Sequence, residues 1–373
     1  MIRRSQALSL VLAAVAALAA PSVPAAEPAP AGPPLAELRL AILPFDNLSG
    51  GPAPIDALRN ELSAMLAERG VTLLDPEVLR GELAERRVRW VGGVDAGTAR
   101  ALWDRHRVNA VLVTHLDLVG GVDGPPRFGL SARLVGTGPD GARVLWATGF
   151  DMAGEERPGL LDLGLVHDPV VLTARALGRL SDELVAYLTT GEQPSVKRGT
   201  QRRFRPRAFH ATPEVAPLGT EPLRVAVLPF SNDSTRRQAG EIVGYRTLSA
   251  LLAIPGLTLL EPGEVRRVLL ETRLIQEGGL TYAQAELLRG LLDVDLVVTG
   301  TVFDFSDPGS FDAAPVVGFT ATGIDARRRQ VAWVSFSYAT GRDRVYFFNA
   351  GDIRTADRVA DELIRGVLDA ARR

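Results

Sequence analysis

The sequence contains no cysteine among its 373 residues. Neither a disulfide framework nor a thiolate metal site can form without cysteine, so core packing must hold the fold together. The absence also leaves no thiol near the N-terminus that could accept a lipid chain. We therefore expect a protein that is not lipidated.

A dominant charge of one sign is also lacking. Lys and Arg number 42 against 44 Asp and Glu, which gives a formal net charge of −2. Such a balance provides no overall basic field to attract nucleic acid. We therefore expect no nucleic-acid partner.

Motifs of known catalytic sites are missing as well. The sequence has no His-Glu-x-x-His zinc motif, no Gly-x-Ser-x-Gly elbow, no Gly-x-x-x-x-Gly-Lys-Ser/Thr phosphate loop and no Gly-x-Gly-x-x-Gly opening a helix. The four histidines are scattered, and we expect His115 to be a hydrogen-bonded structural residue of a strand and not a metal ligand. Glu155 falls in a polar stretch and is expected to stay solvated. We predict no cofactor, no metal and no enzymatic activity.

The N-terminus is typical of an export signal. Two arginines precede an apolar run over residues 7–20, and Val23-Pro24-Ala25 provides small residues suited to cleavage. The run is shorter than the roughly 20 residues needed to span a bilayer, which disfavours the alternative of an uncleaved anchor. We expect a signal peptide over residues 1–26, a short linker over 27–36 and a mature protein in the periplasm, where it could associate with the outer membrane.

An internal repeat is the most informative feature that is present. Residues 38–47 (LRLAILPFDN) are matched by residues 223–232 (LRVAVLPFSN), 185 positions later. Three further segments recur at similar shifts: 71–76 with 257–262, 108–112 with 294–298, and 182–184 with 361–363. So long a period indicates duplication of a whole domain, because solenoid units repeat every ~20–50 residues.

Each copy is predicted to contain the same order of elements. In the second copy, apolar runs predict strands over residues 223–228, 257–260, 294–305, 316–324 and 330–340. Three- and four-residue apolar spacing predicts helices between them, one of them capped by Thr281, and a closing helix over 355–371. The fold class is therefore α/β, layered as α+β, with two tandem duplicated domains, 37–190 and 222–373, each a mixed sheet covered by helices.

A Pro- and Arg-rich linker is predicted between the copies, over residues 191–221. Its basic side chains surround Phe204, and no apolar periodicity persists there. The segment is interpreted as a solvated linker, with binding to an anionic envelope surface as the alternative.

Three motifs of the second copy resemble a known family group. Leu-Pro-Phe-x-Asn after the first strand, LLEPGEV over residues 259–265 and VDLVVTGTV over residues 294–302 are similar to the CsgG curli-secretion family, the TolB N-terminal domain and the LpoB peptidoglycan-synthase activators. The resemblance covers residues 222–373, and the first copy matches less closely. It implies the same fold and the binding of partners in the envelope.

Two groups of residues are candidates for partner binding. Asp46, Asn47, Ser231, Asn232 and Asp233 follow the carboxyl ends of first strands, where open α/β sheets tend to bind ligands. The alternative is that these residues simply form turns.

The second group consists of Tyr346 and Phe347, which stand next to each other with Phe348. Successive side chains of a strand point to opposite faces, so at least one of these rings must lie on the other face from its neighbour. The alternative is that the closing helix covers them.

These observations predict a non-catalytic adaptor or assembly factor that binds another envelope protein. A second copy of the chain is a further candidate partner. A hydrolase of envelope glycans, or a ligand-sensing enzyme, is the alternative function, and a convergent pocket of Asp, Glu and His would favour it.

Overall fold

A short buried strand organises each of two sheets. β1 (Arg39–Ile42) and β8 (Leu223–Val227) are apolar runs, and Pro44 and Pro229 follow them because proline cannot donate to a ladder. The structure is a computed structural model that describes residues 37–120, 125–138, 142–155, 165–193, 204–274, 280–307, 313–343 and 352–373. By their contacts, all of these belong to one unit, Gly32–Arg373.

The first sheet has the strand order β3-β1-β4-β5-β6, with β2 paired to β4. β1 is parallel to β3 and β4, whereas β4, β5 and β6 form an antiparallel meander. Its other elements are β2 (Asp46–Asn47), α1 (Ile55–Glu68), β3 (Thr72–Leu73), α2 (Pro76–Glu85), α3 (Ala96–His106), β4 (Ala110–Gly120), β5 (Arg127–Gly136), β6 (Val144–Ala153) and α4 (Pro169–Thr190).

The second sheet repeats this order as β10-β8-β11-β12-β13, with β9 paired to β11 and one additional strand, β7, beside β13. Its other elements are β7 (Ala208–Ala211), β9 (Ser231–Asn232), α5 (Ala239–Leu252), β10 (Leu257–Leu259), α6 (Pro262–Glu271), α7 (Tyr282–Leu292), β11 (Leu296–Ser306), β12 (Val316–Asp325), β13 (Gln330–Thr340) and α8 (Ala356–Ala371).

The predicted fold class is confirmed. Leu40 pairs with Ala110 in the first sheet, and Val225 pairs with Leu296 in the second, so segments related by the repeat occupy the same sheet positions. Thr281 caps α7 as expected, in a capping box with Gln284. The domain boundaries themselves stay a prediction.

The predicted linker is partly a strand. β7 pairs with the edge of β13, and Phe204 is buried in the core of the second copy. Arg207 lies over the Tyr338 ring, 4.9 Å from its centroid, and donates to the Tyr338 carbonyl oxygen. Composition did not reveal β7 because a four-residue edge strand shows no clear alternation. Binding of an anionic surface stays a prediction.

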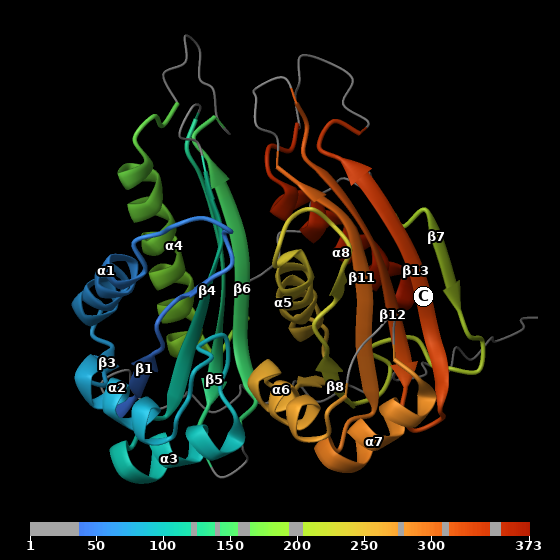
Figure 1. Cartoon of the computed structure of the whole chain (residues 1–373), viewed down its shortest axis with the longest axis horizontal. Coiled ribbons are helices and arrows are strands. Elements are labelled where there is room, and N and C mark those ends of the chain that lie inside the picture. Colours follow the sequence, from blue (N-terminus) through green and yellow to red (C-terminus); the bar gives the residue numbers. More distant parts are fainter. Residues whose placement is uncertain are drawn as a thin grey trace, which may run out of the picture. The chain divides into compact units, whose positions relative to one another are not determined.

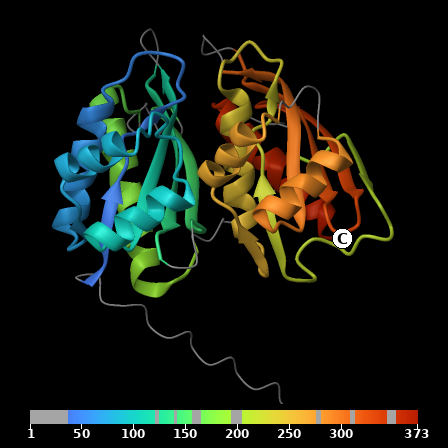
Figure 2. The ribbon, with the colours of Figure 1, turned by 60° about the horizontal axis from the view of Figure 1, so that its bottom comes forward.

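Helical layers cover the sheets unequally (Figures 1 and 2). α1 and α4 pack on one face of the first sheet, and α2 and α3 cover part of its other face. The rest of that other face contacts α5 and α8, which also pack on the second sheet. α6 and α7 lie on the opposite face of the second sheet, near β8. Among the described residues, no helix covers the remainder of that face.

Candidate functional site

The two loops predicted to bind a partner are built alike. The Asn47 side-chain oxygen accepts hydrogen bonds from the backbone and hydroxyl of Ser49, and that of Asn232 accepts the same pair from Ser234. Both amide groups also donate to carbonyl oxygens further along the loop. These side chains therefore hold turns, and their contact with a partner stays a prediction.

The other predicted positions divide between strands and undescribed segments. Asp46 and Ser231 lie in β2 and β9, and the Asp233 amide donates to the Val302 carbonyl oxygen. Tyr346 and Phe347 lie outside the described residues, so the interpretation of their exposure stays a prediction.

A buried ion pair joins the two copies. The Arg133 guanidinium, on β5, donates to both carboxylate oxygens of Glu261 at 2.8 Å, and also to the Gly92 carbonyl oxygen. Glu261 caps the N-terminus of α6, where it accepts from the Gly263 amide. Its side chain and that of Arg133 are 0% and 3% exposed. Such bidentate geometry is the strong form of this interaction.

His115 belongs to the same cluster. It stacks on Tyr245 of α5 with ring centroids 4.0 Å apart, and its Nε2 lies 2.6 Å from an Arg133 nitrogen. Because Arg133 can only donate, Nε2 accepts and the proton sits on Nδ1, 3.5 Å from an Asp46 oxygen. Burial, together with the positive charge of Arg133, lowers the pKa of His115 to about 4. His115 is thus a neutral hydrogen-bonded residue, as predicted.

A second buried cluster surrounds Arg246 on α5. Its guanidinium lies 3.1 Å from Asp117 on β4, 3.4 Å from Asp357 and 2.8 Å from Asp361, both on α8. Burial raises the pKa of Asp117 to about 6, although Arg246 opposes this, and it raises the pKa of Asp357 well above the ordinary value. One cation therefore serves three carboxyl groups.

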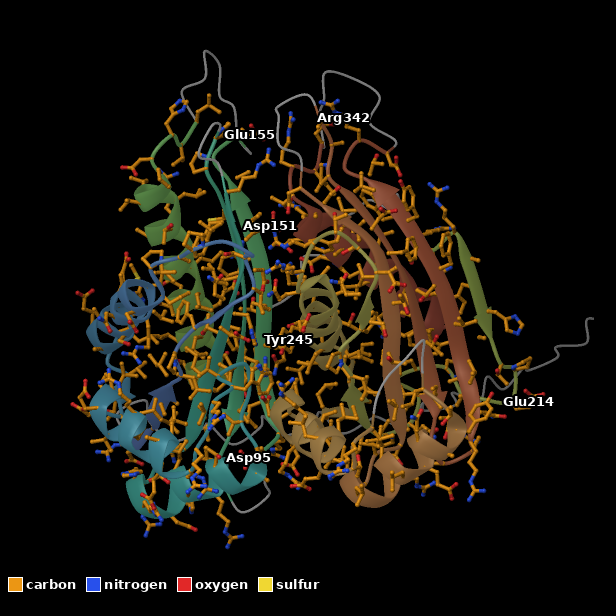
Figure 3. All side chains as sticks on the ribbon, in the orientation of Figure 1. Asp95, Asp151, Glu155, Glu214, Tyr245 and Arg342 are labelled. Carbon is orange, nitrogen blue, oxygen red and sulfur yellow. The ribbon has the colours of Figure 1, made fainter. Side chains whose placement is uncertain are left out.

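Further contacts surround this cluster. Thr355, just before α8, donates to an oxygen of Asp151 on β6. Figure 3 labels Asp151 and Tyr245, on β6 and α5 respectively. Glu155 is 6% exposed and pairs with Arg127, so the prediction that it stays solvated is wrong. An arginine from the neighbouring strand explains the difference, because it replaces the water lost on burial.

The arrangement of these groups is suited to holding elements together. Arg246, Asp117 and Asp357 are at most 2% exposed, so a substrate cannot reach them in this state. Within the described ranges, no group of three or more His, Asp or Glu side chains could hold a metal ion. These clusters form buried polar contacts between the first sheet and the helices of the second copy.

The corresponding face of the second sheet carries different side chains. In the first sheet His115 pairs with Ser131, and Ser131 pairs with Gly149. At the same positions of the second sheet, Thr301 pairs with Thr320, and Thr320 pairs with Phe336. Phe336 thus corresponds to Gly149, where an added Cβ would lie 3.8 Å from Arg246 Nη1. The helix that covers Gly149 has no counterpart over Phe336 among the described residues.

A shared bulge makes the correspondence closer. The register of β4 shifts at Asp117, and that of β11 shifts at Phe303, so both bulges lie at the same place. Asp117 binds Arg246, whereas Phe303 stacks on Phe336 with ring centroids 5.4 Å apart. Gly318 provides space between the Phe303 and Tyr338 rings, because a Cβ there would overlap the Phe303 ring. We define the outer face as Thr301, Phe303, Thr320, Val334, Phe336 and Tyr338.

β13 has an inverted polarity. Ser335 and Ser337 are 2% and 0% exposed on the side of the helices, whereas Val334 and Phe336 are 39% and 40% exposed on the other side. A strand that faces water normally shows the opposite pattern. Adjacent exposed apolar side chains of this kind are common at contact surfaces.

Several solved structures are similar to parts of this chain. No protein-family model and no curated protein matches the chain. The PelC dodecamer from Paraburkholderia phytofirmans is similar at 21% identity and a TM-score of 0.31, over 44% of this chain and 95% of that one. Lipoprotein GNA1162 from Neisseria meningitidis is 18% identical with a TM-score of 0.26, over 39% and 98%. The LpoB C-terminal domain from Salmonella enterica is 13% identical with a TM-score of 0.27, over 31% and 82%.

Of the helices in the described part of the chain, none combines the length and the apolar character that crossing a bilayer requires.

Proposed function

We propose that this chain is a non-catalytic assembly factor of the bacterial envelope that acts by protein contact through the outer face. The predicted export signal and the resemblance to the CsgG, TolB N-terminal and LpoB group support the location and the adaptor role. The inverted polarity of β13 carries the assignment of the surface, because it leaves Val334 and Phe336 exposed above two buried serines.

The chemistry of the outer face fits protein binding. Phe303 on β11 stacks on Phe336 of β13, and Tyr338 lies on the same face across Gly318, with the Arg207 guanidinium over its ring. Aromatic rings bury a large area and lose few rotamers on binding, so such groups commonly supply most of the affinity of an interface. In the first copy the same sheet face is already occupied by α5 and α8, whereas no described helix covers the outer face of the second copy.

We expect a photo-crosslinking residue in place of Phe336 to form a discrete protein adduct in living cells. A benzophenone side chain is suitable because it keeps an aromatic group at the position. Leu270 is the matched control, since it is 65% exposed on α6 and lies outside the outer face. The adduct is identified by mass spectrometry and should disappear when Val334→Asp is added.

The absence of any adduct at position 336, or equal adducts at positions 336 and 270, would contradict the proposal. An adduct that survives Val334→Asp would also count against it, because the contact would then not depend on the outer face.

A further inference from the structure

The chain contains its own example of how this sheet face is covered. On the first sheet, α5 contacts β5 and β6, and α8 contacts β6. These two helices belong to the second copy, where they also cover the inner face of their own sheet. One helical layer therefore packs against two sheets. The layers follow one another in the order α1 with α4, the first sheet, α5 with α8, and the second sheet.

The two outermost layers of this stack differ from each other. One end is the helical layer of α1 and α4, and the other is the outer face of the second sheet. The equivalent face of the first sheet is already covered by a helical layer of the same fold, formed by α5 and α8. A contact between unlike surfaces of identical chains is heterologous, and it repeats from one chain to the next.

The exposed side of α1 is compatible with the rings of the outer face. Ala57, Ala64 and Ala67 are exposed there, together with Asn60. Small side chains leave room for Phe303 and Phe336, which protrude from the sheet where the first copy has Asp117 and Gly149. On α4, Val171 adds an apolar side chain that is 41% exposed.

We infer that the outer face binds the α1 and α4 layer of a second copy of this chain, head to tail. The inference rests on the proposed function, because it names the occupant of the same surface. It continues the contact that already joins the two copies within one chain, with aromatic packing in place of the buried ion pairs.

The absence of cysteine allows a direct test in the purified mature protein. Two variants are prepared, Ala64→Cys on α1 and Thr320→Cys on β12, and each carries a different tag. A short bismaleimide is added to each variant alone and to their mixture. We expect a crosslinked dimer only in the mixture, because head-to-tail contact brings position 64 of one chain to position 320 of another.

A third substitution tests the role of the ring. Phe336→Thr, made in the Thr320→Cys chain, should reduce the yield of crosslinked dimer at least about tenfold, which corresponds to ~1.4 kcal/mol. Threonine is chosen because it keeps strand propensity. Leu270→Asp in the same chain is the control and should leave the yield unchanged.

Other outcomes separate this inference from the proposed function. Crosslinking of Thr320→Cys with itself would show a symmetric sheet-to-sheet contact and overturn the inference. Failure to crosslink in the mixture would also overturn it. If the benzophenone at position 336 meanwhile captures a different envelope protein, the proposed function stands without self-association.

Discussion

Glu261→Ala is expected to lower the free energy of unfolding by about 3–5 kcal/mol, because it leaves the buried Arg133 guanidinium without a carboxylate. Arg133 would keep its contacts with the Gly92 carbonyl oxygen, with His115 and with the Tyr245 ring, none of which carries a negative charge. α6 would also lose its N-cap. Urea denaturation of the purified protein measures the change.

Asp75→Ala is the matched control for this prediction. Asp75 occupies the position of Glu261 in the first copy and caps α2 by accepting from the amides of Glu77 and Val78. Its loss should therefore cost only the value of a cap, about 1 kcal/mol. The difference between the two variants measures the contacts that Glu261 makes with the first copy, which are the ion pair with Arg133 and the hydrogen bond from the Val94 amide. Equal losses would show that the contact between the copies does not depend on them.

Arg246→Leu should be comparably destabilising, by about 3–5 kcal/mol at pH 7, because it leaves Asp117, Asp357 and Asp361 without their common cation. Arg69→Leu is the control. Arg69 pairs with Asp182 at 2.8 Å, but this pair is partly exposed to solvent and should contribute at most about 1 kcal/mol.

The Arg246→Leu defect should become smaller at pH 5. The pKa of Asp117 is already raised to about 6 in the folded protein, so the folded state binds more protons than the unfolded chain between about pH 4 and 6. Stability contributed by this group is therefore present at low pH and is lost as pH rises through 6. Without Arg246 the buried carboxyl groups favour the protonated, neutral form more strongly, so acid should restore part of the variant's free energy of unfolding. A defect that grows at pH 5, or one no larger than that of Arg69→Leu, would contradict this assignment.

The sequence predicted most strands because their signals are local. An apolar run ended by proline, or a threonine followed three residues later by glutamine, needs no information from elsewhere in the chain. Arg133 and Glu261 instead meet across 128 residues, and Asp117 and Arg246 across 129. The available signal was indirect: His115 and Asp117 interrupt an apolar strand, and such residues need partners when they are buried.

The outer face was missed for a different reason. Aromatic and apolar residues of β13 occur on both of its sides, Trp333 on one and Phe336 on the other, so alternation alone does not decide which side is exposed. Serine is usually exposed in folded proteins, but Ser335 and Ser337 are both buried. The packing of α8 on the sheet determines which side of β13 is buried and which is exposed.

Hydroxyl-radical footprinting of the aromatic side chains tests whether the outer face is a binding surface. Phe303, Phe336 and Tyr338 should be oxidised in dilute, monomeric purified protein and protected in the intact envelope. Tyr245, which lies under the corresponding face of the first sheet, should be protected in both states. Equal oxidation of the three outer rings in the two states would contradict the claim that this face is a binding surface.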